Sequence, residues 1–134
     1  MCFSPEASFT ASAVLLTAGI IAIRESRLTY KLPFAVIPIF FSLQQFSEGV
    51  LWVALQRPEF AHWQHVATIS FLIFAQVVWP LWVPLSMLAI EKKQLTIKAL
   101  AILTLFGFLI SGYLLYCILV FKVLASTDCF HIYY

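Results

Sequence analysis

The chain has 134 residues, of which 63% are hydrophobic and 10% are charged, and its formal net charge at pH 7 is +2. Soluble domains are about 45–50% apolar and about 25% charged, so a soluble protein of this length could not hide so much apolar surface. The small net charge gives no basic stripe for a nucleic acid. We therefore expect one integral membrane domain over residues 1–134, with the lipid bilayer around it and no nucleic-acid partner.

Four apolar runs approach the roughly 20 residues that a helix needs to cross a bilayer. They predict an all-α bundle of four transmembrane helices at about residues 5–23, 33–55, 66–90 and 97–121. The first run opens with Ser4-Pro5-Glu6, an N-cap residue followed by a proline and an acid in the first turn. A cleaved signal peptide is the competing interpretation of this run, but no Lys or Arg precedes it.

Basic residues are unevenly distributed between the segments that connect these helices. Six of the eight lie in or directly beside the connections between the first and second spans and between the third and fourth: Arg24, Arg27, Lys31, Lys92, Lys93 and Lys98. Arg57 and Lys122 fall on the opposite side. The positive-inside rule makes the basic segments cytoplasmic. We therefore predict a multi-pass protein of the bacterial inner membrane whose N-terminus and C-terminus lie outside.

Two further patterns predict packing rather than chemistry. Small residues let helix backbones approach closely in lipid, and they recur at Ser8 and Ser12 of the first span and along one arc of the fourth, at Thr104, Gly107 and Ser111. The third span contains the sequence WPLWVP, in which two prolines four residues apart remove backbone donors. We expect this span to bend there.

The second span carries a polar patch within its apolar run. Gln44, Gln45 and Glu48 fall within about 100° of one another on a helix, and Trp52 lies on the same face. An intramembrane charge costs on the order of 2.5–3.5 kcal/mol at a helix centre, so we expect Glu48 to face the bundle interior. Gln76 of the third span lies at a matching depth and is the predicted partner of Gln44.

Two interpretations of the patch remain open. It is either a set of hydrogen bonds between helices, each worth about 0.6 kcal/mol in membranes, or the lining of a ligand, ion or proton site. An intramembrane carboxyl is a functional candidate by default. The candidate binding residues are therefore Glu48, Gln44, Gln45, Gln76 and Trp52.

Several side chains that can bind metal or undergo oxidation are predicted to lie on the outer side. His62, His65, Asp128 and His131 are the candidate ligands of a metal ion, although their spacing matches no standard zinc pattern. No other cofactor is predicted. Cys2 and Cys129 each lie just beyond a span on the oxidising side, so a disulfide between them is a further prediction.

The chain resembles an uncharacterised family of bacterial multi-pass membrane proteins. The resemblance rests on the opening MCFS, on QQxxEGxxW from Gln44 to Trp52, and on WPxWxP from Trp79 to Pro84. The family carries no assigned activity, so the resemblance implies a class and no mechanism. Its members look longer, which implies that this chain is a shortened member or part of a longer protein.

Together these observations predict a protein that binds or passes a small ligand or ion at a polar pocket around Glu48, with homo-oligomerisation as a further expectation. The first alternative is a membrane-embedded redox or metal-dependent enzyme that uses the cysteines and histidines of the outer side. The second is a structural or assembly subunit of a membrane complex, in which the patch only holds helices together.

Overall fold

The computed structural model describes residues 4–26, 29–128 and 131–133. In chain order its elements are α1 (Pro5–Glu25), η1 (Thr29–Lys31), α2 (Leu32–Ala35), α3 (Ile37–Gln56), η2 (Pro58–Trp63), α4 (Gln64–Leu72), η3 (Ile73–Val78), α5 (Trp79–Ile90), α6 (Gln94–Val120), β1 (Ser126–Asp128) and β2 (His131–Tyr133). Of these, η1 and η2 are 3-10 helices and η3 is a π-helix. The predicted cap of α1 is confirmed, since the Ala7 amide donates to Ser4 Oγ at 3.2 Å.

The elements combine into four helical stretches that are long and apolar enough to cross a membrane. They are Pro5–Glu25, Leu32–Gln56, Pro58–Ile90 and Gln94–Val120. The predicted all-α architecture of four apolar helices is thus confirmed, and the described residues add to it only the short strands β1 and β2. The third stretch begins at Pro58 rather than near residue 66, because η2 continues directly into α4. This start was not predicted because Glu59 and His62 in η2 are polar, and the span was placed where the continuous apolar run begins.

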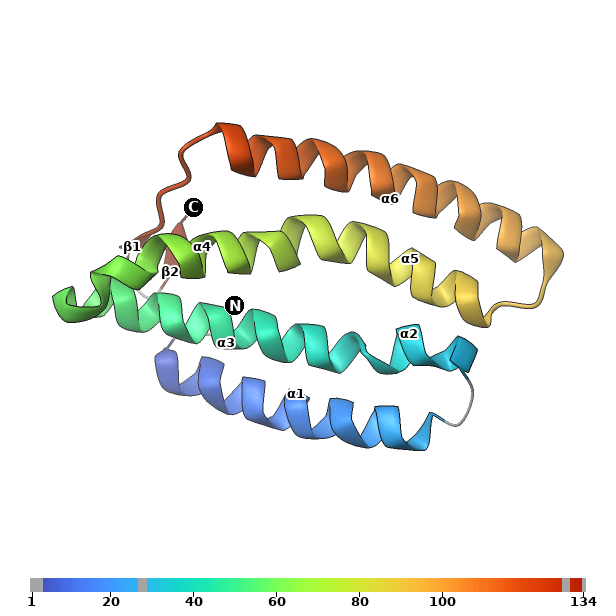
Figure 1. Ribbon diagram of the computed structural model, residues 1–134, viewed down its shortest axis with the longest axis horizontal. Helices are drawn as coiled ribbons and strands as arrows, with labels where there is room; N and C mark the ends of the chain where they lie inside the picture. The colour runs from blue at the N-terminus through green and yellow to red at the C-terminus, as the bar shows by residue number, and fades with distance from the viewer. Residues whose placement is uncertain (1–3, 27–28, 129–130, 134) are drawn as a thin grey trace.

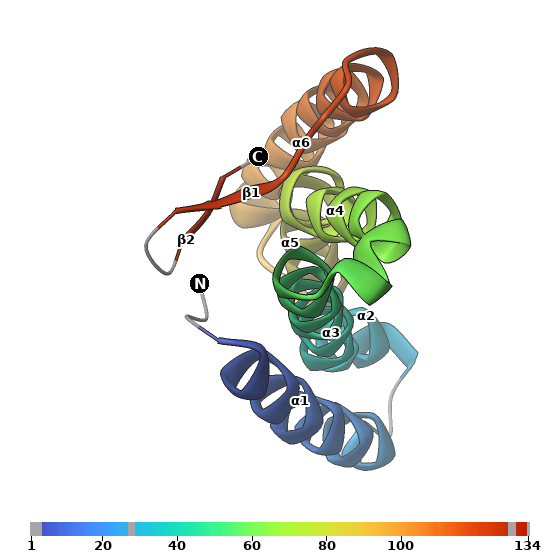
Figure 2. The same cartoon turned by 90° about the vertical axis from the view of Figure 1, so that its left-hand side faces the viewer.

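Successive stretches lie side by side and run antiparallel (Figure 1). We call the end with the α1–α2 and α5–α6 connections the basic end, since Arg24, Lys31, Lys92 and Lys93 lie there, and the opposite end the hairpin end. Seen from the hairpin end, the stretches form a curved row with α1 and α6 at its two edges (Figure 2). The strands β1 and β2 lie on one side of this row.

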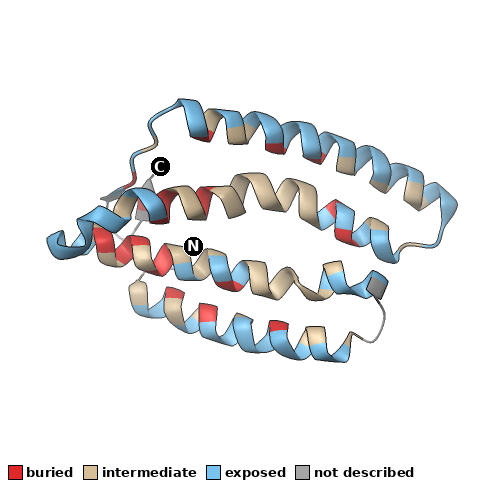
Figure 3. Cartoon of the chain, viewed as in Figure 1, coloured by how far each residue is buried: buried red, intermediate tan, exposed pale blue. Residues whose placement is uncertain are grey.

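Buried residues in each stretch face the neighbouring helices, and the outward faces are exposed (Figure 3). The outward face of α6 is strongly apolar and exposes Leu95, Phe108 and Leu119. Such a surface would aggregate in water, whereas lipid chains are a suitable solvent for it.

The second stretch is interrupted between α2 and α3. Pro38 has no backbone N–H and cannot continue the hydrogen-bond pattern of α2. Near this break, the carbonyl of Pro33 in the short α2 accepts a hydrogen bond at 2.9 Å from the indole Nε1–H of Trp82 in α5. Phe40 packs against the same indole edge to face, with ring centroids 4.9 Å apart. The break is therefore stabilised by a side chain from the next stretch.

The third stretch contains the π-helix η3, which ends just before Pro80; the bend expected at the two prolines stays a prediction. The wider turns of η3 accommodate a proline whose ring would otherwise meet the preceding turn. Pro84 likewise removes the donor that would reach the Pro80 carbonyl. Gly107 of α6 packs against this carbonyl. Next to it, Ser111 Oγ–H donates to the Val77 carbonyl at 2.7 Å, so the small-residue arc of the fourth span does pack against the third.

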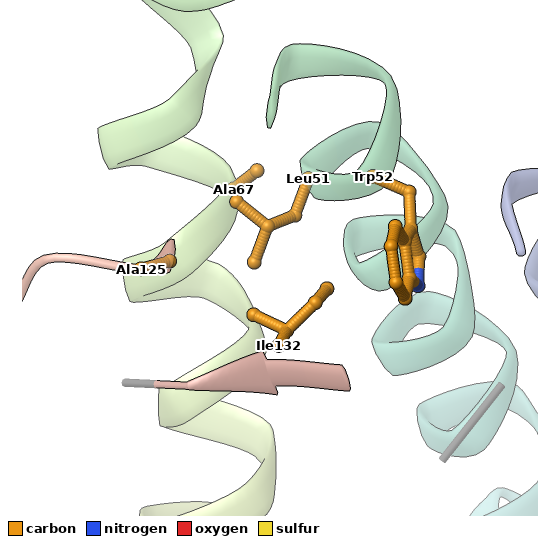
Figure 4. Close-up of a cluster of buried hydrophobic side chains, with 5 residues drawn as sticks. All are labelled: Leu51, Trp52, Ala67, Ala125 and Ile132. Atoms are coloured by element: carbon orange, nitrogen blue, oxygen red, sulfur yellow. The ribbon is translucent and has the colours of Figure 1, made fainter. Parts of the chain in front are cut away.

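The strands β1 and β2 pair antiparallel, with Thr127 opposite Ile132, and were not predicted from the sequence. They cover the hairpin end, where Ala125 and Ile132 join a buried cluster with Leu51, Trp52 and Ala67 (Figure 4). Gln64 of α4 connects to the segment just before β1, because its Nε2 donates a hydrogen bond to the Ala125 carbonyl at 2.7 Å. An apolar core therefore holds the hairpin against α3 and α4.

The close contact between α5 and α6 predicts unequal effects of two glycine substitutions in the same helix. A Cβ at Gly107 would overlap the Pro80 carbonyl, whereas a Cβ at Gly112 would have no atom within 4 Å. We expect Gly107→Ala to lower the free energy of unfolding by about 1–3 kcal/mol. Gly112→Ala should leave it unchanged or raise it by up to about 1 kcal/mol. Thermal unfolding in detergent measures both, and equal melting temperatures would contradict this packing.

Candidate functional site

Glu48 lies on α3, the helix between α1 and the third stretch, and is 1% exposed. Gln45, one turn earlier, donates from Nε2 to Glu48 Oε2 at 3.2 Å. The expectation that Glu48 faces the interior therefore agrees with its burial. A carboxyl group so far from solvent is disfavoured in its charged form unless polar groups or a cation compensate for the lost hydration.

The flank of α3 that carries Glu48 is covered by the C-terminal hairpin. Trp52 follows Glu48 by one turn, so the two side chains lie about 40° apart around the helix. Trp52 is 3% exposed and belongs to the cluster that contains Ile132 of β2. The hairpin thus packs on the side of α3 to which Trp52 and the neighbouring Glu48 belong. Figure 4 shows Trp52 and Ile132 in this cluster.

Gln44 forms a connection to the third stretch, but through a residue other than the predicted one. Its amide oxygen accepts a hydrogen bond from the indole Nε1–H of Trp79, at the start of α5. Phe41 stacks on the same indole, with centroids 4.1 Å apart and planes inclined by 30°. The predicted pairing of Gln44 with Gln76 is therefore wrong. Gln76 lies within η3, whose extra residue per turn changes the direction of its side chain relative to a regular helix.

The interface between α1 and α3 contains a reciprocal pair of serines. Ser12 Oγ lies 2.9 Å from the Ser42 carbonyl oxygen, Ser42 Oγ donates to the Ser12 carbonyl at 2.8 Å, and the two hydroxyl oxygens are 3.1 Å apart. Both residues are buried. This pair satisfies its own polar groups and serves to hold the helices together.

Ser8, one turn before Ser12, is different. It is 0% exposed, and its Oγ has no hydrogen-bond partner within the part of the chain that the structure describes. Buried hydroxyl groups without partners are rare, and an ion or a water molecule is a common explanation for one. The sequence showed Ser8 only as a small residue suited to packing, and the missing partner could not be seen from it.

The side of the interface on which Ser8 lies follows from its neighbours. Phe9 packs edge to face on Phe46, with centroids 5.6 Å apart. Relative to the Ser12–Ser42 contact, Ser8 and Phe9 point to opposite flanks of α1, since successive residues turn by about 100°. On α3, Gln45 and Glu48 likewise lie on the flank opposite Phe46. Ser8 therefore lies on the same flank of the interface as Gln45 and Glu48.

The candidate metal and disulfide residues are only partly described. His62 is exposed beside Trp63, with ring centroids 5.3 Å apart, and His65 lines a cavity of about 140 Å³ near Ala125. The backbones of Asp128 and His131 are paired between β1 and β2, but their side chains lie outside the described part, as do Cys2 and Cys129. Among the side chains that are described, no three His, Cys, Asp or Glu gather into a metal-sized group. The metal site and the disulfide stay predictions.

Comparison with known proteins gives a family. Over residues 1–134 the chain matches the family described as "Family of unknown function (DUF6629)". The chain belongs to this family. No curated protein and no solved structure matches it. Membership agrees with the resemblance to an uncharacterised family and adds no activity, so a function must be argued from the residues.

The contact between Gln44 and Trp79 predicts a measurable coupling between α3 and α5. Trp79→Phe removes the indole donor while keeping a ring against Phe41, and Gln44→Leu removes the acceptor. In a double-mutant cycle the two substitutions should show a coupling energy of about 0.6 kcal/mol, and at most about 1.7 kcal/mol. Unfolding in detergent measures it. Strictly additive effects would mean that this hydrogen bond contributes nothing to stability.

Proposed function

We propose that this family member is a multi-pass protein of the bacterial inner membrane that binds a monovalent cation, either a proton or an alkali ion, at Glu48. The observation that carries the proposal is the presence of two unusual buried groups on one flank of the α1–α3 interface. One is a carboxyl that is 1% exposed, and the other is the hydroxyl of Ser8, buried without a partner among the described residues.

The size and charge of the ligand follow from the surroundings of Glu48. Because the side chain is almost completely enclosed, its ligand must be of ionic size rather than an organic molecule. One carboxylate carries one negative charge, so a monovalent cation leaves a neutral complex in the apolar interior, whereas a divalent cation would leave an uncompensated charge. The carboxylate, the Ser8 hydroxyl and the amide oxygen of Gln45 are all oxygen donors, which suit protons and hard cations.

The membrane, its orientation and self-association belong to the same proposal. The two basic connections lie at one end of the bundle, and the positive-inside rule makes that end cytoplasmic. The hairpin end, and with it Glu48, would then lie toward the outside. The helices form an open curved row with α1 and α6 at its edges, a shape that leaves both edges available to a second copy of the chain.

The proposal predicts that cations stabilise the folded protein through Glu48. We expect the melting temperature of the purified protein to depend on pH or on sodium or potassium concentration, with choline chloride as the reference salt. A ligand at one hundred times its dissociation constant stabilises by about 2.7 kcal/mol. Glu48→Gln should abolish this dependence while the protein still folds, because the amide keeps the shape of the side chain and loses its charge.

A matched pair of serine substitutions separates cation binding from a purely structural role. Ser8→Ala should weaken the dependence on cations, whereas Ser12→Ala should lower stability without changing it, because Ser12 is satisfied by Ser42. If Glu48→Gln and both serine variants lower the melting temperature but retain the wild-type cation dependence, the patch only holds helices together. The structural-subunit alternative would then replace the proposal.

A further inference from the structure

A cavity of about 370 Å³ lies at the basic end, where η1 and α2 contact α5. Its lining combines two kinds of side chain. Lys31 and Lys92 bring two ammonium groups and Tyr30 a phenol, whereas Phe34 and Ile90 are apolar. The residues come from two connections that are far apart in the sequence, and the fold brings them together.

The walls of this cavity are held by specific hydrogen bonds. The Trp82 indole donates to the Pro33 carbonyl at 2.9 Å and thereby fixes α2 against α5. On the other side, Glu91 Oε1 accepts hydrogen bonds from the backbone amides of Lys92 and Lys93 at 2.8 and 2.9 Å. These contacts position the two connections independently of any bound molecule.

Glu91 lies in the chain between the lining residues Ile90 and Lys92, and its contacts favour its ionised form. The hydrogen bonds from the Lys93 and Lys92 amides lower the pKa of its carboxyl below the ordinary value. The Glu91 carboxylate is thus hydrogen-bonded to the backbone amides of the connection. The side chains of Lys31 and Lys92 line the cavity itself. The lining therefore carries two positive charges.

The level of the cavity relative to the apolar stretches favours a lipid over a soluble anion as its ligand. Lys31 directly precedes the Leu32–Gln56 stretch, and Ile90 ends the Pro58–Ile90 stretch, so the cavity lies at the boundary between the apolar helices and water. A phosphate group of a lipid lies at this level, with its glycerol and acyl chains pointing along the apolar side. Phe34 and Ile90, both exposed, extend the lining in that direction.

We propose that this cavity binds the phosphate headgroup of an anionic phospholipid. Lysine ammonium groups bind phosphate as point charges, and tyrosine is favoured at the interface, where its hydroxyl can donate to the headgroup while its ring stays among the chains. Basic pockets between transmembrane helices are suited to lipid headgroups in general. The binding is independent of the cation proposed at Glu48, which lies toward the other end of the bundle.

Native mass spectrometry of the purified protein in detergent, titrated with phosphatidylglycerol, tests the proposal. We compare the double variant Lys31→Gln/Lys92→Gln with Lys93→Gln/Lys98→Gln, a control that loses the same charge near the same end outside the cavity lining. The cavity variant should bind phosphatidylglycerol at least about tenfold more weakly than the wild type. The control should stay within about threefold of it. Melting temperatures verify that both variants fold.

Two outcomes would overturn the proposal. Equal weakening in both double variants would mean that lipid responds to the general charge of this end rather than to a site. Displacement of phosphatidylglycerol by millimolar inorganic phosphate would mean that the cavity recognises a free anion and not a lipid. Phosphatidylcholine, whose headgroup carries no net charge, should bind the wild type and the cavity variant equally.

Discussion

The arrangement of this protein depends on how neighbouring helices contact one another's backbones near the prolines that interrupt them. In lipid an unsatisfied carbonyl has no water to bond, and each one costs several kcal/mol. Pro38, Pro80 and Pro84 each remove a donor from a helix interior or its margin. Near these prolines, side chains of a neighbouring helix donate hydrogen bonds to backbone carbonyls. The neighbouring helix therefore bonds to the backbone as well as burying side chains.

Three contacts show how this is done. The indole of Trp82 bonds the Pro33 carbonyl, and the hydroxyl of Ser111 bonds a carbonyl of the π-helix η3. Gly107 allows the Pro80 carbonyl to lie directly against α6. Two kinds of residue thus join neighbouring helices. Trp82 and Ser111 reach across to a backbone carbonyl, and Gly107 has no side chain and lets two backbones come into contact. The indole of Trp82 also holds α2 against α5 beside the cavity at the basic end. This hydrogen bond therefore contributes both to stability and to the position of the proposed lipid site.

The polar residues inside the bundle differ in whether they connect two helices. Ser12 with Ser42, and Gln44 with Trp79, form pairs that bridge two helices. Glu48 accepts a hydrogen bond from Gln45 of its own helix, whereas the buried hydroxyl of Ser8 has no partner within the part of the chain that the structure describes. This difference separates the groups that hold the helices together from the flank to which we assign cation binding. The hairpin covers that flank through Ile132 and Trp52, so access to it depends on a segment held mainly by apolar contacts and by the Gln64 hydrogen bond.

The order of the polar and apolar residues alone determined the four helices, the cap at Ser4 and the inward direction of Glu48. Each follows from local backbone chemistry or from the cost of exposing charge to lipid. The partner of Gln44 was beyond such reasoning. The comparison of depths in the membrane assumed regular α-helices. Gln76 lies in the π-helix η3, where side chains point in other directions than in an α-helix. The tertiary structure likewise decided three further features. They are the lack of a partner for Ser8 among the described residues, the packing of β2 in the cluster of Trp52, and the cavity that Lys31 and Lys92 both line. Each depends on distances between segments that are remote in the chain, and those distances are set by how the helices pack.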